Sequence, residues 1–113
     1  IFGNDYKTKD GTAIRDYIHI TDLIDAHYLA LKDNNIGIDI LNVGTGTGYS
    51  VYDLVNSFEQ INKIKIPIKI TKRRKGDVAI CFADNTKIKQ KLKWKPKKDI
   101  TQMCKDSYEF ILN

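Results

Sequence analysis

The sequence predicts an α/β fold, because segments with the two-residue period of strands alternate along the chain with segments that have the period of helices. Residues 64–70 alternate isoleucine with lysine or proline, as in a strand with one buried face. Residues 51–61 instead place apolar side chains at helical spacing behind a polar start. The 113 residues are enough for one domain with its own core, and no repeat or low-complexity linker divides them.

The first third of the chain is predicted to hold a long loop, a short strand and a helix. Turn-forming residues occupy much of 3–11, and the run Tyr-Ile-His-Ile at 17–20 has the character of a strand. Either Thr21 or Asp22 can cap the helix that follows, which ends at 34–37. The apolar positions of this helix are Leu23, Ile24, His27, Tyr28 and Leu31.

A second strand is predicted at 38–43, and it leads into the sequence NVGTGTGYSVYD, which covers 42–53. Ser50 and Asp53 fit a capping box, in which the serine accepts from a free N–H of the first helical turn and the acid reaches back. This pair therefore predicts the start of the helix over 51–61.

The rest of the chain is predicted to contain an edge strand and two helices. The proline within 64–70 cannot donate to a ladder, so this strand is expected at the edge of the sheet. A short helix is expected to begin at Asp84 or Thr86 and to run through Leu92. A last helix is expected after caps at 99–102. Its predicted inner face is Met103, Cys104, Ser107, Tyr108 and Ile111.

A strand, a glycine-rich turn and a helix are also the parts of a dinucleotide-binding site, which the stretch at 42–53 imitates. The fingerprint needs glycine at its first, third and sixth positions, and here Gly44 and Gly46 are followed by Tyr49 at the sixth. No acidic residue stands near 64–67, where one is needed to bind the ribose. We therefore predict a strand-to-helix turn and no cofactor site in this chain.

Composition narrows the class of protein. The net charge of +5 raises the question of nucleic acid, but only KRRK at 72–75 is dense and no aromatic residues interleave with it. Solvated surface lysine explains most of the charge better, so no nucleic-acid partner is predicted. Cys81 and Cys104 have neither metal-ligand nor disulfide-framework spacing, which indicates a reducing, cytoplasmic compartment. No run approaches the roughly 18 apolar residues of a membrane span, and no signal-peptide pattern is present.

Two loops that carry arginine are the better candidates for binding an anion. Arg15 stands where a loop enters a strand, and Arg74 lies in the basic cluster 72–77, right after the isoleucine-rich segment. Loops at strand ends hold the ligands of open α/β sheets, and the planar fork of arginine suits phosphate. Gly76 lets the turn fold close to a ligand, and Asp77 is placed to accept from a sugar hydroxyl. On composition alone, a solvated charge run remains the other explanation of this cluster.

No catalytic constellation is recognisable. His19 has no nucleophile at a useful spacing, and we interpret it as a structural histidine. Tyr28 and Lys32 have the spacing of a Tyr-x-x-x-Lys pair, but no serine precedes them and the tyrosine is expected to face the core. We therefore assign no catalytic residue and no metal ligand to the chain.

Three blocks of the sequence resemble one known family. FGNDYKTKDGTAIRDYIHITDLIDAH at 2–27 is similar to the start of the carboxy-terminal part of UDP-glucose 4-epimerases, which read close to FGNDY-x-T-x-DGT-x-x-RDYIH-x-x-DL. LNVGTGTGYSV at 41–51 resembles their N-x-G-x-G-x-G-x-SV turn, and RRKGDVAICFAD at 73–84 resembles their RR-x-GD segment. The similarity covers essentially the whole chain. The first block separates epimerases from related nucleotide-sugar dehydratases and decarboxylases.

The resemblance implies that 1–113 form the carboxy-terminal, UDP-sugar-binding lobe of an extended short-chain dehydrogenase/reductase fold, without its amino-terminal lobe. In that family the absent lobe binds NAD, carries the Tyr-x-x-x-Lys pair and forms the homodimer contact. The family interconverts UDP-galactose and UDP-glucose through a 4-keto sugar, and NAD takes and returns the hydride.

The resemblance also implies a role for individual residues. Phe2 lies beside the uracil, while Arg15 and Arg74 contact the diphosphate. Asp77 accepts from the ribose, and Gly76 makes the necessary turn possible. These roles agree with the two arginine loops selected from the residues themselves.

Cys81 matches a position that is a tyrosine bounding the sugar pocket in some members of the family. A smaller residue leaves more room there, so tolerance of the bulkier UDP-N-acetylhexosamines is predicted.

Two functions of different classes fit these observations. The first is the substrate-binding part of a UDP-glucose 4-epimerase, inactive when separated from the rest. The second is a non-catalytic nucleotide-sugar-binding module or inactive remnant. Because the chain opens with Ile-Phe-Gly and no initiator methionine, we expect a fragment of a longer protein. A basic nucleic-acid domain is a third, weaker alternative.

Overall fold

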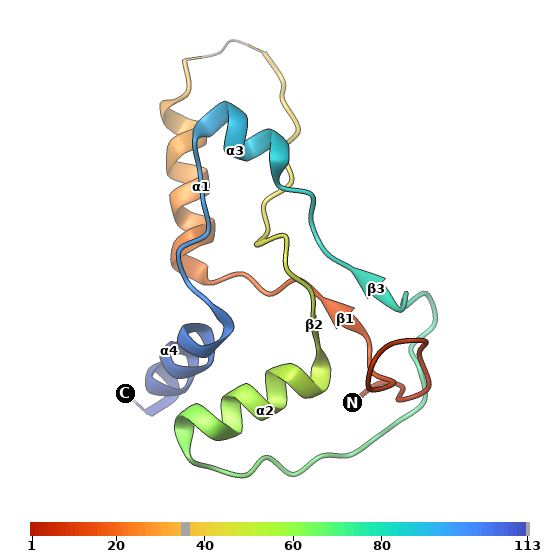
Figure 1. Cartoon of the computed structure of the whole chain (residues 1–113). Helices are drawn as coiled ribbons and strands as arrows, with labels where there is room; N and C mark the ends of the chain where they lie inside the picture. Colours follow the sequence, from red (N-terminus) through yellow and green to blue (C-terminus); the bar gives the residue numbers. More distant parts are fainter. Residues whose placement is uncertain (35–36, 113) are drawn as a thin grey trace.

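The computed structural model describes residues 1–34 and 37–112, whose path Figure 1 traces. The helices of these residues are α1 (Ile20–Lys32), α2 (Val51–Asn62), α3 (Thr86–Leu92) and α4 (Ile100–Leu112). The strands are β1 (Ile14–Arg15), β2 (Tyr49–Ser50) and β3 (Ile80–Cys81). The predicted α/β class is confirmed, although each of these strands is only 2 residues long.

The strand β1 is central, paired antiparallel with β2 and parallel with β3. In the parallel pair, Ile14 lies opposite Ile80 and Arg15 lies opposite Cys81. Because β1 and β3 run in the same direction, their carboxyl ends meet at one edge of the sheet. That edge carries Arg15 and Cys81, two of the residues predicted to bind ligand.

Polar residues begin three of the helices where the sequence predicts. Ser50 Oγ accepts from the N–H of Asp53 (3.0 Å), and the Asp53 carboxylate accepts from the N–H of Ser50 (2.9 Å), so the capping box of α2 is confirmed. Helix α3 begins at Thr86. At the start of α4, the Asp99 carboxylate accepts from the N–H of Gln102 (2.8 Å).

The start of α1 differs from the prediction. The strand predicted at 17–20 is wrong, because the helix already begins at Ile20 and its cap is His19. The Nδ1 atom of His19 accepts from the N–H of Thr21 (3.1 Å), so the imidazole occupies the capping position. The carboxylate of Asp22, which the sequence offered as a cap, instead accepts from the N–H groups of 97–98 (3.0 Å each).

The apolar face predicted for α1 is not its buried face. Three of the predicted residues are more than half exposed, namely Ile24, Tyr28 and Leu31. The helix packs its other side, with Ala26, against Ile88 of α3 and against Trp94. Nε1 of Trp94 donates to the carbonyl of Asp22 (2.9 Å), which fastens the segment after α3 to α1. The predicted helix end at 34–37 lies partly outside the described residues.

Two predicted strands, at 38–43 and 64–70, are wrong, because neither segment takes part in a ladder. The side chain of Ile38 is 99% exposed. The second segment pairs only just past its end, where Thr71 forms an isolated parallel bridge with Phe2. A strand needs a neighbouring strand for its N–H and C=O groups, and among the described residues neither segment has such a partner along its length. The apolar pattern of these segments therefore predicted strands with a buried face, which the described residues do not form.

Helices α2 and α4 pack together at the end of the molecule opposite α3 (Figure 1). The rings of Phe58 and Tyr108 meet edge to face, with their centres 5.7 Å apart. Cys104 is buried as predicted, but Ser107 and Ile111, also predicted on the inner face of α4, are exposed. They are exposed because α2 covers only part of that face.

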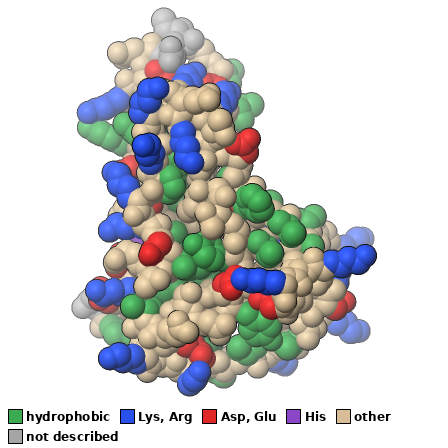
Figure 2. Space-filling view, viewed as in Figure 1, with side chains coloured by type: hydrophobic (Ala, Val, Ile, Leu, Met, Phe, Trp, Pro, Cys, Tyr) green, Lys and Arg blue, Asp and Glu red, His purple; other side chains and the backbone are tan. Residues whose placement is uncertain are grey.

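The molecule is elongated, with principal extents of 48 × 35 × 20 Å. Its radius of gyration is 16.4 Å, whereas a compact domain of this length has about 13 Å. Figure 2 shows basic side chains spread over the visible face rather than gathered in one patch. Within the described ranges, no helix combines the length and the apolar character needed to cross a membrane.

Candidate functional site

The residues predicted to bind ligand form two groups, one at each end of β3. The turn 74–77 leads into the strand, and Cys81 ends it opposite Arg15. Four residues of extended chain span at most about 14 Å, which is the largest separation of Asp77 from Cys81. The two groups are therefore within reach of one elongated ligand.

The first group brings the amino terminus of the chain to the turn before β3. The guanidinium carbon of Arg74 lies 4.7 Å from the centre of the Phe2 ring. Nε of Arg74 donates to the Asp77 carboxylate (3.0 Å), and the N–H of Asp77 donates back to the carbonyl of Arg74 (3.3 Å). Gly76 makes this turn at φ +90°, in the left-handed region that favours glycine. Four predicted residues thus converge.

Arg74 keeps donors available for a ligand. Its side chain is 62% exposed, whereas that of Asp77 is 23% exposed. Only its Nε is engaged by protein among the described residues, so the two terminal nitrogens remain free to bind an anion. The contact with the Phe2 ring is a cation–π interaction, which holds the side chain in place before a ligand arrives.

The neighbouring Arg73 has a structural task instead. Its Nε donates to the Asp5 carboxylate (2.6 Å), and its Nη2 donates to the carbonyl of the same residue. Its guanidinium carbon also lies 4.1 Å from the centre of the Tyr6 ring. The hydrogen bond from Arg73 holds the pKa of Asp5 below its ordinary value. Of these two arginines, Arg74 is the one left to face a ligand.

The second group lies at the carboxyl edge of the sheet. Arg15 and Cys81 are opposite each other in the parallel ladder, and both line a cavity of about 490 Å³ together with Phe82 and Asp84. The Arg15 Nη1 atom donates to the carbonyl of Ile14 (2.8 Å). The volume falls within the roughly 300–1,000 Å³ of small-molecule sites. An arginine and a small exposed thiol therefore border a space large enough for part of a ligand.

Asp16, which was not among the predicted site residues, anchors this edge. Its Oδ1 accepts from the N–H (2.9 Å) and the hydroxyl (2.6 Å) of Thr45, and its Oδ2 accepts from the N–H groups of Gly46 (2.9 Å) and Ala83 (3.2 Å). Burial opposes ionisation of the carboxyl, but these bonds outweigh it and hold the pKa of Asp16 below its ordinary value. Two features of the sequence could have pointed to Asp16: it is an acid directly after Arg15, and the chain contains a glycine turn whose N–H groups need an acceptor.

The same contacts explain why the glycine turn does not fit a dinucleotide. The N–H groups of Thr45 and Gly46, which a phosphate would need, already bind the Asp16 carboxylate. A Cβ atom at Gly44 would lie 2.6 Å from both Asp16 Oδ2 and the Cβ of Ala83, so this glycine serves close packing within the chain. The turn then ends in the capping box of α2. The anion that this turn binds is therefore the Asp16 carboxylate of the protein itself.

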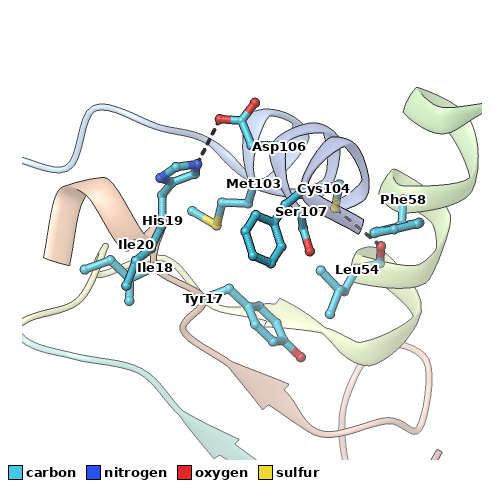
Figure 3. Close-up of a pocket in the computed structure, with 11 residues that line it drawn as sticks. Tyr17, Ile18, His19, Ile20, Leu54, Phe58, Met103, Cys104, Asp106 and Ser107 are labelled. Carbon is cyan, nitrogen blue, oxygen red and sulfur yellow. Dashed lines mark hydrogen bonds and ion pairs between the residues drawn. The ribbon is translucent and has the colours of Figure 1, made fainter. Parts of the chain in front are cut away.

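A larger cavity of about 720 Å³ lies between the segment 17–20, α2 and α4 (Figure 3). Its lining is mainly apolar, with the pair of His19 Nε2 and Asp106 Oδ2 (3.0 Å) beside it. Because Nδ1 of His19 accepts from the α1 backbone, Nε2 carries the proton and donates to Asp106. Both nitrogens therefore have partners within the protein, as the structural interpretation of this histidine requires. None of the predicted site residues lines this cavity, which lacks converging donors for phosphate.

The pair of Tyr28 and Lys32, which has the Tyr-x-x-x-Lys spacing, does not form a catalytic site. Nζ of Lys32 lies 4.4 Å from the centre of the Tyr28 ring, on the exposed side of α1. The prediction that Tyr28 faces the core is therefore wrong. No group of three or more His, Cys, Asp or Glu side chains in the described part of the chain is arranged to hold a metal ion.

An arginine held between an aromatic ring and an acid, with a second arginine at the carboxyl edge of a parallel strand pair, is an arrangement that suits an extended, phosphate-bearing ligand. The chain belongs to the family described as GDP-mannose 4,6 dehydratase, whose sequence profile matches residues 3–107.

Among the relatives, UDP-glucose 4-epimerase of Bacillus subtilis is 48% identical over 112 residues, which are 97% of this chain and 33% of that protein. The predicted resemblance to UDP-glucose 4-epimerases is thus confirmed. This chain spans about a third of the length of the relatives it matches.

Two solved structures of UDP-glucose 4-epimerases also resemble this chain in their three-dimensional fold. UDP-glucose 4-epimerase of Bifidobacterium longum, in complex with NAD+ and UDP, superposes with a TM-score of 0.94 at 38% identity, over 99% of this chain and 34% of that one. The UDP-glucose 4-epimerase of Stenotrophomonas maltophila, with bound NAD and formylated UDP-arabinopyranose, superposes with a TM-score of 0.90 at 44% identity, over 97% of this chain and 33% of that one. The described fold is therefore that of a part of these epimerases.

Proposed function

We propose that this chain is the UDP-sugar-binding, carboxy-terminal third of a UDP-glucose 4-epimerase that interconverts UDP-galactose and UDP-glucose. The full-length enzyme is this chain together with the rest of that protein. The rest binds NAD, supplies the catalytic Tyr-x-x-x-Lys pair and forms the homodimer contact. NAD provides the hydride chemistry there. The glycine-rich turn of the described residues does not bind NAD, because its N–H groups already donate to Asp16. The described residues instead bind and orient the substrate.

The observation that carries the proposal is the convergence of Phe2, Arg74 and Asp77. A ring, a guanidinium and a carboxylate meet at one place from distant parts of the sequence. Base stacking uses an aromatic ring, a diphosphate is bound by a guanidinium, and a ribose hydroxyl donates to a carboxylate. These three groups match the three parts of UDP in kind.

The backbone beside Phe2 supports the placement of the base. The bridge to Thr71 uses the carbonyl of Ile1 (2.8 Å) and the N–H of Gly3 (2.9 Å). The N–H and C=O of Phe2 itself therefore face the opposite side. A donor and an acceptor stand together there, as pairing with the imide edge of uracil requires.

The second group takes the other end of the ligand. Arg15 contacts the diphosphate together with Arg74, and Cys81 borders the hexose. The small side chain of Cys81 leaves space in the cavity of about 490 Å³, which supports the admission of UDP-N-acetylhexosamines as well.

Calorimetric titration of the full-length enzyme with UDP tests these assignments. Arg74→Ala is expected to weaken binding by about 1.5–3 kcal/mol, the scale of a charge-assisted hydrogen bond, and Arg15→Ala by a similar amount. Lys75→Ala is the matched control, since it removes an exposed cation next to Arg74 that is not among the residues assigned to the ligand. Unchanged affinity of Arg74→Ala, or an equal loss for Lys75→Ala, would refute the assigned roles.

A further inference from the structure

We propose that Asp16 is a positioning residue of the UDP-sugar pocket, whose carboxylate fixes the ends of β1 and β3 relative to each other and thereby sets the spacing of Arg15 and Cys81. The inference rests on the proposed function, because that function gives these two residues their contacts with the ligand. Asp16 also lines the cavity, but its two oxygens already accept four hydrogen bonds from the protein, so its assigned role is to position other residues and not to bind the ligand.

The short ladder explains why another connection is needed. The strands β1 and β3 are 2 residues long, and they end at Arg15 and Cys81. Asp16 is the first residue past β1, and its Oδ2 accepts from the N–H of Ala83 (3.2 Å), just past β3. The carboxylate therefore continues the connection between the two strands at the point where the ladder stops.

The same carboxylate joins a third segment. Its Oδ1 binds both donors of Thr45, so the glycine turn is fastened to the end of β1. The buried amide of Asn85 donates to the carbonyl of Gly44 (2.8 Å), which ties the turn to the segment after β3 from the other side. Three segments thus meet at one acidic side chain, and the cavity is bordered by the ends of two of them and by 41–43, which lead into the third.

Close packing leaves this junction little freedom. Gly44 has no side chain, and a Cβ there would lie 2.6 Å from both Asp16 Oδ2 and the Cβ of Ala83. Because Arg15 directly precedes Asp16, fixing this carboxylate also fixes the backbone that carries the guanidinium.

The decisive variant is Asp16→Asn in the full-length enzyme. The amide keeps the size of the side chain, but its NH₂ group faces N–H donors and at least one of the hydrogen bonds is lost. We expect Kd for UDP and KM for UDP-glucose to rise about tenfold. We expect kcat to stay within about twofold, because Arg15 contacts the diphosphate equally in the ground and transition states.

A matched control separates positioning from general stabilisation. Asp10 also accepts from several donors, namely the N–H and hydroxyl of Thr12 and the hydroxyl of Ser50, but it fastens the first loop to α2 away from the cavity. Asp10→Asn is expected to lower the unfolding temperature and to leave KM within about twofold of wild type. Thr45→Val removes one donor from Asp16 with little change of shape, and it replaces Asp16→Asn if that variant does not fold.

The outcomes are distinct. If wild-type enzyme binds UDP but Asp16→Asn and Thr45→Val lower only the unfolding temperature, with KM unchanged, Asp16 has a structural role alone and the inference is wrong. A KM increase of the same size in Asp10→Asn also overturns it. If the wild-type enzyme does not bind UDP, the proposed function itself fails, and this inference fails with it.

Discussion

The guanidinium carbon of Arg74 lies 4.7 Å from the centre of the Phe2 ring, although the two residues come from opposite parts of the chain. The parallel bridge between Phe2 and Thr71 brings the segments together, and the hydrogen bond from Arg74 Nε to Asp77 (3.0 Å) fixes the guanidinium from the other side of the turn. The arginine is thus held in place before ligand binding, and less conformational freedom is lost when the ligand arrives.

Removing the ring should affect a nucleotide more than a plain phosphate ligand. In the full-length enzyme, Phe2→Ala is expected to weaken UDP binding by about 1–3 kcal/mol, the scale of one base–aromatic stack. Loss of the cation–π contact alone accounts for about 0.5–1 kcal/mol at an exposed site, and this smaller loss should apply to inorganic pyrophosphate. Competition titrations with both ligands measure the difference. Equal losses for both ligands would show that Phe2 does not contact the base.

The size of Cys81 is expected to decide which sugars are accepted. Cys81→Tyr places a bulky ring in the cavity beside Arg15, so turnover of UDP-N-acetylglucosamine should fall relative to UDP-glucose. A change of about 10- to 200-fold in the ratio of kcat/KM values is the scale for steric discrimination in a pocket. Cys81→Ser, which keeps the size, is the control. An unchanged ratio in the tyrosine variant would remove Cys81 from the sugar pocket.

Stability is expected to fall in acid through the carboxylates that fasten the loops. Burial opposes ionisation of Asp10, but hydrogen bonds from Ser50 and Thr12 outweigh it and hold the pKa of Asp10 below its ordinary value. Because the folded pKa is lowered, this stabilisation is complete above the unfolded value of about 3.9 and is lost as the pH falls through the folded pKa.

The unfolding temperature of the full-length enzyme, followed by circular dichroism, should therefore vary little between pH 7 and 5 through this group and fall below about pH 4. Asp10→Asn should destabilise most near neutrality, and its difference from wild type should shrink in acid. Asp25→Asn, which loses only the exposed pair with Lys97, should have a small effect. A difference for Asp10→Asn that is the same at every pH would contradict the assigned linkage.

The parts predicted correctly from the sequence depend on local chemistry. The Ser50–Asp53 box is complete within four consecutive residues, so it needs no information about the rest of the fold. The selection of Arg74 also came from a short motif, in which Gly76 and Asp77 define a turn, together with the resemblance. The structure then showed how Arg74 and its neighbour differ in their contacts, which the sequence alone does not reveal.

The parts that were wrong or missed depend on distant partners. The segment 38–43 has the pattern of a strand, but no described segment pairs with it, and Ile38 remains exposed. The cap of α1 is a histidine, outside the usual Ser, Thr, Asp and Asn. Asp16 was missed because its donors at Thr45 and Ala83 lie far along the chain, and no spacing rule connects them.

The most direct test of the proposed function is the conversion of UDP-galactose to UDP-glucose by the purified full-length enzyme, compared with residues 1–113 alone. We predict NAD-dependent turnover by the full-length enzyme, and none by the 113-residue chain, whose glycine turn is filled by Asp16. A full-length protein that binds UDP but does not convert UDP-galactose would instead indicate a non-catalytic nucleotide-sugar-binding module. Turnover by residues 1–113 alone would contradict the assignment of the catalytic groups to the rest of the enzyme.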